Sequence, residues 1–434
     1  MRRRTVNKRF TLFEDKALKE KYYYAKHESG LDIYVFPKRM TQKTAWLGVK
    51  LGSFYEEGAI VDGDKKSYPS GIAHFLEHKL FSSADGVDAC EILASIGADA
   101  NAFTSNNKTV YMFSCTENFD KALAELVRFV YNTHFTAENV KSERGIITQE
   151  IRMCADSPYD TVSRNLLLAL YGKCKLSSDV LGTEGSIAKI NEKTLYDCYR
   201  SFYRCSNMAL VVCGDVDGDS VLDAVDNNLP KKAAQDSPVL PVLSHTSAVK
   251  KSYIEKAMSV SQPIFEIGIK DAMPSADSYE RLSRDVAMTI LDEMLFSRAS
   301  ELFGELFEGG FINESYSYGY SITRDAASHS IYGEGDDPKF VLEKIKAYIR
   351  RIKERGLSES DFLRCKRVMY AEFIRDFDSV DDVAGSLINI VFDGGELFEY
   401  RKIIDGVTFE DVNACLYSSF NEECFALSVI NKID

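Results

Sequence analysis

Residues 71–81 read Gly71-Ile72-Ala73-His74-Phe75-Leu76-Glu77-His78-Lys79-Leu80-Phe81 and contain two of the six histidines of the chain. The apolar residues recur at helical spacing, which predicts a helix over residues 72–81 that is anchored in a core. Residues four apart on a helix lie above one another, so His74 and His78 project from one face and can both reach a single metal ion. Glu77 lies on that face as well, one step around the helix.

Two imidazoles with a nearby carboxylate are what a catalytic zinc site requires. Zinc takes nitrogen and oxygen ligands at about 2.0–2.2 Å, leaves one position for water and lowers the pKa of that water. A neighbouring carboxylate can then take the proton and hand it to the leaving amine. We therefore predict His74 and His78 as metal ligands and Glu77 as the general base. The alternative is a polar helix face, but the order H-x-x-E-H favours the catalytic interpretation.

A catalytic zinc ion needs a third protein ligand, and a carboxylate from another helix is a common choice beside two histidines. The helix predicted over residues 137–154 offers Glu143 and Glu150, which lie seven residues apart and so on one face. On the residues alone, either glutamate can be the ligand. Both can also be solvent-facing groups of an amphipathic helix.

Around this region, strands and helices follow one another in an order that repeats in the second half of the chain. In the first half we expect strands at 31–36, 44–51, 109–114 and 208–213, and helices at 72–81, 87–95, 119–132 and 137–154. In the second half we expect strands at 263–270, 315–322, 328–334 and 425–431, and helices at 278–296, 299–307, 338–354 and 359–376.

This repetition predicts an α+β fold of two similar halves, each a mostly antiparallel sheet packed by helices. Three of the nine prolines fall in a short polar stretch and mark a connector. We place a catalytic, metal-binding half at residues 1–228, a linker at 229–250, and a half without metal ligands at 251–434. The alternative is two unrelated α/β segments that alternate in the same way.

Direct alignment of the halves supports duplication. Residues 136–140 align with 358–362, and both segments place Ser or Thr just before a helix as a favourable N-cap. The second half keeps no histidine at the positions of the metal motif. Opposite His74, Glu77 and His78 stand Thr289, Asp292 and Glu293. We therefore predict one zinc ion per chain.

The composition excludes several classes of partner. The net charge of −13 argues against nucleic-acid binding, and it indicates either an acidic solvated surface or an acidic cavity that attracts basic peptides. No run approaches the roughly 18–20 apolar residues of a membrane-spanning helix. The basic start, residues 1–4, is followed by no apolar signal segment. Ten cysteines without a C-x-x-C pair indicate reduced thiols and a cytoplasmic location.

The H-x-x-E-H stretch, together with Ser142-Glu143-Arg144-Gly145-Ile146-Ile147-Thr148-Gln149-Glu150, resembles the pitrilysin/insulinase family of inverted-motif zinc peptidases. The resemblance runs from about Leu31 to the C-terminus and is strongest to the smaller members similar to mitochondrial processing peptidase subunits. It implies Zn²⁺ as the cofactor and Glu150 as the third ligand. It also implies that Glu143 orients a ligand histidine or the bound water.

Residues 97–104 and 109–111 resemble the substrate-binding edge strand of that family. The resemblance implies that Asn101, Ala102 and Phe103 contact a peptide substrate, which adds to the sheet as a further strand through backbone hydrogen bonds. Without the resemblance, these residues would be interpreted as a plain hairpin.

One part of the family pattern is missing. Where relatives carry an Arg and a Tyr that contact substrate, residues 306–313 contain no arginine, and Tyr316 lies beyond them. Some relatives act as pairs of chains, so we expect a homodimer or a heterodimer with a related chain.

The predicted function is a zinc-dependent endopeptidase for short or unfolded peptides, acting alone or with such a partner. The alternatives are a non-catalytic or regulatory subunit of a processing-peptidase-like complex and hydrolysis of a non-peptide amide.

Overall fold

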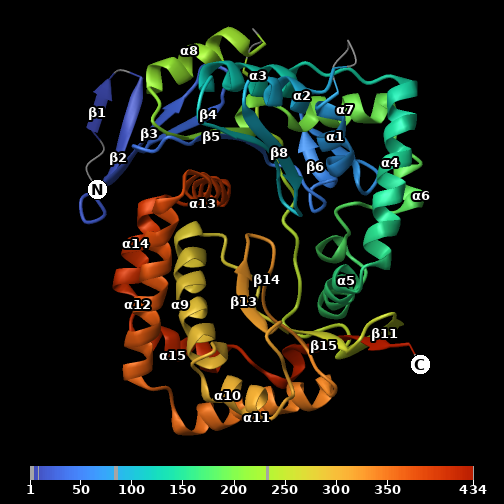
Figure 1. The fold of residues 1–434 in the computed structure, drawn as a ribbon, viewed down its shortest axis with the longest axis vertical. Helices are drawn as coiled ribbons and strands as arrows, with labels where there is room; N and C mark the ends of the chain where they lie inside the picture. Colours follow the sequence, from blue (N-terminus) through green and yellow to red (C-terminus); the bar gives the residue numbers. More distant parts are fainter. Residues whose placement is uncertain (1–3, 8, 83–86, 231–233, 434) are drawn as a thin grey trace. The chain divides into compact units, whose positions relative to one another are not determined.

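The computed structural model describes residues 4–7, 9–82, 87–230 and 234–433 (Figure 1). The chain forms two compact units, each built around its own sheet. One unit comprises Met1–Ile151, Ser178–Pro241 and Ile374–Phe398, and the other comprises Arg152–Ser177, Val242–Phe373 and Glu399–Asp434. Residues 1–3 of the basic start and residues 231–233 of the expected linker lie outside the described residues.

The first unit contains an eight-stranded sheet with the order β1-β2-β3-β4-β10-β5-β9-β8. Its strands are β1 (Arg4–Asn7), β2 (Phe10–Asp15), β3 (Glu20–Lys26), β4 (Asp32–Pro37), β10 (Met208–Gly214), β5 (Lys43–Val49), β9 (Thr109–Cys115) and β8 (Ala98–Thr104). Neighbouring strands run antiparallel except β4 and β10, which are parallel. Strand β8 therefore forms one edge of the sheet.

Helices cover both faces of this sheet (Figure 1). Helices α1 (Ile72–Leu80), α2 (Ala89–Ser95) and α3 (Phe119–Tyr131) pack on one face, against β5, β8 and β9. Helix α13 (Val380–Phe392) packs on the other face, against β5 and β10. The remaining elements of this region are β6 (Glu57–Val61), β7 (Asp64–Ser67), α4 (Ala137–Asp156), α6 (Glu184–Ile187), α7 (Glu192–Phe202) and α8 (Gly218–Asn228).

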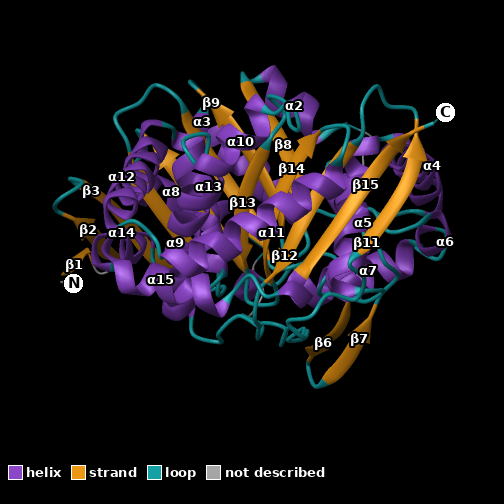
Figure 2. Ribbon diagram, turned by 90° about the horizontal axis from the view of Figure 1, so that it is seen from below, coloured by secondary structure: helices purple, strands orange, loops and turns teal. Residues whose placement is uncertain are grey.

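The second unit contains a five-stranded sheet with the order β11-β15-β12-β14-β13 (Figure 2). Its strands are β11 (Tyr253–Met258), β15 (Phe425–Lys432), β12 (Ile264–Lys270), β14 (Ala327–Glu334) and β13 (Ser317–Ile322), and only β11 and β15 pair in parallel. The helices are α5 (Pro158–Tyr171), α9 (Ser278–Phe296), α10 (Glu301–Glu308), α11 (Pro338–Arg355), α12 (Glu359–Arg375), α14 (Leu397–Gly406) and α15 (Phe409–Ser418).

Each unit takes one helix from the other half of the sequence. Helix α5 follows the first-half helix α4 but packs against β11, β12 and β15. Helix α13 lies late in the chain but packs on the sheet of the first unit. Two sheets, each largely antiparallel and packed by helices, confirm the predicted α+β class. The sequence-based division at residues 229–250 assumes continuous halves and stays a prediction.

The predicted N-caps are present at both aligned helices. The Thr136 hydroxyl accepts a hydrogen bond from the backbone N–H of Asn139 at 3.2 Å, and the Ser358 hydroxyl accepts one from Asp361 at 3.3 Å. Throughout the described ranges, no helix combines the length and the apolar character that crossing a membrane requires.

Candidate metal centre

Helix α1, which carries the H-x-x-E-H stretch, is almost completely buried. It begins after Gly71, whose φ of 89° suits glycine, and a β-carbon there would lie 2.4 Å from the carbonyl oxygen of Leu181. The carboxylate of Glu56 accepts hydrogen bonds from the backbone N–H groups of Gly71 (2.9 Å) and Ala73 (3.4 Å). Glu56 is fully buried, so a carboxylate anchors the positive end of this short helix.

The structure brings His74, His78 and Glu150 together. One donor atom from each residue lies within 4.8 Å of the others. The Nε2 atom of His74 is 3.6 Å from Glu150 Oε1, and the Nε2 atom of His78 is 3.6 Å from Glu150 Oε2. Ligand atoms bound tetrahedrally at zinc distances are roughly 3.3–3.6 Å apart, so this donor set fits a zinc ion.

The two histidines differ in their surroundings. Burial, with a smaller contribution from His78, lowers the pKa of His74 to about 3, so this imidazole is neutral and ready to bind a metal. Burial also acts against the charged form of His78, but the hydrogen bond to Glu143 and the nearby carboxylates outweigh it and raise the pKa of His78. Below its raised pKa, His78 has to lose a proton before it can bind a metal.

Glu143 contacts one histidine of the cluster. Its Oε1 atom is 3.0 Å from Nδ1 of His78, which leaves Nε2 of that ring facing Glu150. Burial alone would raise the pKa of Glu143, but His78 and Lys79 outweigh it and lower that pKa. An ionised carboxylate on the far ring nitrogen is a common support for a metal-binding histidine.

Glu77 is not one of the three clustered donors, and its side chain is held separately. Its Oε2 atom accepts a hydrogen bond from the Thr104 hydroxyl at 2.5 Å. Burial raises the pKa of Glu77, and the hydrogen bond from Thr104 acts against this rise. A raised carboxyl pKa suits a group that takes up a proton near neutral pH and releases it again.

Asn101, Ala102 and Phe103 lie on the edge strand β8, which ends at Thr104 and so beside Glu77. They pair with Met112, Tyr111 and Val110 of β9. The Phe103 ring packs edge-to-face against Trp46, with 6.1 Å between centroids. The backbone N–H of Ala102 donates to Oδ1 of Asn101 at 2.8 Å. The edge strand β8, which ends beside Glu77, is therefore extended, and most of its residues are partly exposed.

Sequence reasoning missed three contributors to this site. Glu56 precedes Gly71 by 15 residues, and no local pattern connects the two residues. Thr104 belongs to the stretch that resembles the substrate-binding edge strand, but nothing in the sequence indicates that its hydroxyl contacts Glu77. Lys79 is buried although its residue type favours solvent, and its position directly after His78, in a helix anchored by apolar residues, was the one available signal.

The aligned positions of the second unit form no such cluster among the described residues. Asp292 instead hydrogen-bonds Nδ1 of His329 at 2.7 Å, and both residues are buried. Glu293 accepts a hydrogen bond from the Tyr318 hydroxyl at 2.5 Å. Tyr316, the displaced tyrosine, is buried and donates to the carbonyl oxygen of Phe296 at 3.1 Å.

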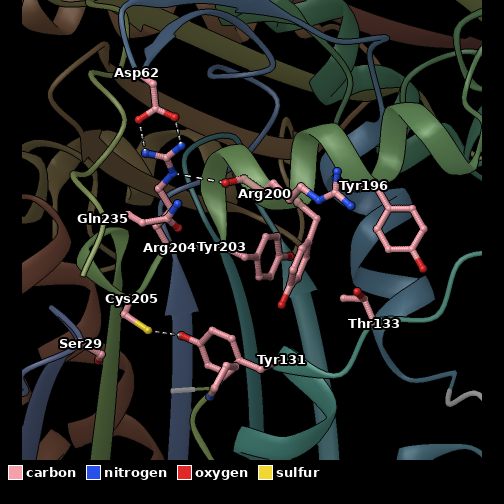
Figure 3. A pocket seen from close by; sticks show the side chains of 12 residues that line it. Ser29, Asp62, Tyr131, Thr133, Tyr196, Arg200, Tyr203, Arg204, Cys205 and Gln235 are labelled. Carbon is pink, nitrogen blue, oxygen red and sulfur yellow. Dashed lines mark hydrogen bonds and ion pairs between the residues drawn. The ribbon is translucent and has the colours of Figure 1, made fainter. Parts of the chain in front are cut away.

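A separate cavity of about 510 Å³ lies in the first unit (Figure 3). Four tyrosines and two arginines line much of it: Tyr131, Tyr196, Tyr199, Tyr203, Arg200 and Arg204. Arg204 is committed to Asp62 through two hydrogen bonds of 2.8 and 2.5 Å, and the Tyr203 hydroxyl lies 2.7 Å from that of Tyr111. None of the predicted site residues lines this cavity, so it is distinct from the metal cluster.

Comparison with known proteins identifies the family. Residues 37–184 match the family model described as Insulinase (Peptidase family M16), and residues 189–369 match the one described as Peptidase M16 inactive domain. The uncharacterized zinc protease YmfH of Bacillus subtilis is 33% identical over 403 residues, which cover 92% of this chain and 94% of YmfH. The chain belongs to peptidase family M16. The predicted membership of the insulinase family is thus confirmed.

Two solved structures share the fold. An M16-like peptidase from Alicyclobacillus acidocaldarius has a TM-score of 0.91 and 27% identity, and the match covers 97% of this chain and all of that one. The periplasmic protease PqqL from Escherichia coli has a TM-score of 0.72 at 19% identity, with 94% of this chain matching 47% of PqqL. At that identity the likeness to PqqL concerns the fold alone.

Proposed function

We propose that this M16 chain is a zinc-dependent endopeptidase that hydrolyses short or unfolded peptides. The observation that carries the proposal is the convergence of His74, His78 and Glu150 within 4.8 Å, with Glu77 held beside them by Thr104. One Zn²⁺ per chain would be bound by these three residues. When bound, zinc supplies a Lewis acid that activates a water molecule.

Two glutamates of the chain would supply further parts of the mechanism of peptide hydrolysis. Glu77 accepts a proton at its carboxylate from the attacking water and returns it to the leaving amine, a task that its raised pKa favours. Glu143 holds the His78 ring through Nδ1, so that Nε2 stays directed at the cluster. No tightly packed specificity pocket is needed for these steps.

The substrate is proposed to add to the free edge of β8 as an antiparallel or parallel strand. Asn101, Ala102 and Phe103 would contact it, and the end of that strand at Thr104 touches the general base. Backbone hydrogen bonds recognise an extended chain with little regard for its sequence. Folded proteins would be excluded, because their backbone groups are already paired.

The test is cleavage of a peptide library by the purified chain, with zinc measured by elemental analysis. Replacing Glu77 with Gln should leave zinc content unchanged and reduce cleavage by at least about 100-fold. Equal cleavage by the Gln variant would overturn the mechanism. Zinc without cleavage by the parent would favour a non-catalytic or regulatory subunit, and absence of zinc would remove the metal centre.

We further propose that the active form is a dimer, either of this chain or with a related chain that supplies the missing arginine. Size measurement by light scattering, with activity assayed before and after addition of a related chain, tests this. The proposed compartment is the cytoplasm, because the cysteines in the described part of the chain form no disulfide bond. Recovery of the protein in the periplasmic fraction, the compartment named for PqqL, would contradict that assignment.

A further inference from the structure

Lys79 is a charged residue placed in the interior beside the metal cluster. Its side chain is 3% exposed, and the residue directly follows His78 in a helix whose residues are nearly all buried. A buried ammonium group is costly unless it has partners. Its Nζ atom lies 3.1 Å from the Ser82 hydroxyl and 3.5 Å from Oε2 of Glu143. The position of Lys79 is thus linked to that of Glu143.

The two oxygens of Glu143 have different partners. Oε1 lies 3.0 Å from Nδ1 of His78, while Oε2 faces Lys79. A carboxylate held at only one oxygen can rotate about its side-chain bonds, whereas one held at both is fixed in direction. Lys79 and His78 therefore hold Glu143 between them, with its side chain only 12% exposed.

We propose that Lys79 is a positioning residue of the metal centre, which acts through Glu143 to keep His78 aimed at the ion. The inference rests on the proposed function, since it concerns zinc binding at His74, His78 and Glu150. The polar contacts of Lys79 are with Ser82 and Glu143, not with the three donor atoms of that cluster. Its effect on the metal is indirect.

The ammonium group of Lys79 affects zinc affinity in two opposite ways. The ammonium is a positive charge that repels a nearby cation, so through this effect alone its removal would tighten zinc binding. The ammonium also supports Glu143 and so preserves the orientation of His78, and through this second effect its removal would weaken zinc binding. Loss of a supporting partner typically costs about 10-fold to 100-fold in metal affinity. Positioning is expected to prevail, because the ammonium is already neutralised by Glu143.

The experiment measures the zinc dissociation constant of the metal-stripped full chain by competition with a chromophoric chelator. Lys79→Met, which keeps an unbranched side chain but removes the charge, should weaken zinc binding about 10-fold. Lys79→Arg should restore binding to within a few-fold of the parent. Lys141→Met serves as the matched control, because Lys141 is exposed on α4 near Glu143, and it should have no effect.

A double-variant comparison separates positioning from general packing. In a Glu143→Gln background, Lys79→Met should cause little further loss, because the route through Glu143 is already broken. Unchanged or tighter zinc binding by Lys79→Met, or an equal loss in both backgrounds, would overturn the inference while leaving the proposed function intact. A parent chain that binds no zinc would overturn both.

Discussion

Thr104 is the residue through which the sheet edge touches the general base. Its hydroxyl hydrogen bond lowers the pKa of Glu77 and so offsets part of the rise caused by burial. Thr104→Val should raise that pKa further, and the acidic limb of the pH profile of kcat/KM should move up by about one pH unit. Thr104→Ser should keep the parent profile. An unshifted limb in the Val variant would show that Glu77 is not the group titrating there.

Zinc binding should depend on pH through His78. Its pKa is raised in the metal-free protein, chiefly because its hydrogen bond to Glu143 and the nearby carboxylates outweigh burial. Below that pKa a proton competes with the metal, so affinity should rise about tenfold per pH unit and level off above it. Calorimetry in buffers of different ionisation enthalpy would detect the released proton. Zinc binding without proton release at pH 6 would contradict this prediction.

At the level of single residues, the sequence predicts which side chains share a helix face, because that depends only on their spacing. His74 and His78 share a face because of their spacing alone, and the structure brings them together with Glu150, while Glu77 is held separately by Thr104. The choice of Glu150 over Glu143 came from resemblance, since both lie on one face of α4. Glu56 could not be foreseen, because its partner N–H groups become its neighbours only after the chain has folded.

At the scale of secondary-structure elements, the backbone of β5 at Gly48 lies close to side chains of α13. A β-carbon added at Gly48 would lie 2.6 Å from Cδ1 of Ile388 and 2.9 Å from the Phe392 ring. Gly48→Ala should therefore lower the free energy of unfolding by about 1–3 kcal/mol through overpacking. Urea unfolding followed by circular dichroism measures this change.

The matched control is Gly145→Ala in the interior of α4. An added β-carbon there meets no atom within 4 Å, so the substitution should stabilise the helix by up to about 1 kcal/mol. A loss of stability at Gly145 equal to that at Gly48 would mean that the contact with Ile388 is not the cause.

Element prediction was accurate where periodicity was strong. The helix at Ser278–Phe296 and the strand at Thr109–Cys115 lie within one residue of their expected bounds. Strands β2 and β3 were not foreseen, because only some of their alternate residues are buried. Helices α5 and α13 were also missed. Periodicity identifies the apolar face of a helix but cannot name a partner sheet that is distant in sequence.

On the scale of the whole molecule, the second unit has a buried, hydrogen-bonded pair, Asp292 and His329, at the positions aligned with the metal helix of the first. Burial raises the pKa of Asp292, and His329 acts against that rise. His329→Leu should leave the buried Asp292 side chain without its hydrogen-bond partner and cost about 1–3 kcal/mol of unfolding free energy. Zinc content of the folded protein should stay the same. Replacing both residues with Leu should recover much of the loss, and failure to do so would point to packing instead of the lost hydrogen bond.

The packing of the late helix α13 on the first sheet also affects folding during synthesis. Strands β5 and β10 leave the ribosome long before Val380–Phe392 is synthesised, so one face of that sheet lacks its covering helix in the nascent chain. At about 5–20 residues per second, the delay is roughly ten to thirty seconds. During that interval the exposed apolar face is a natural target for chaperones, and chains released before α13 should aggregate.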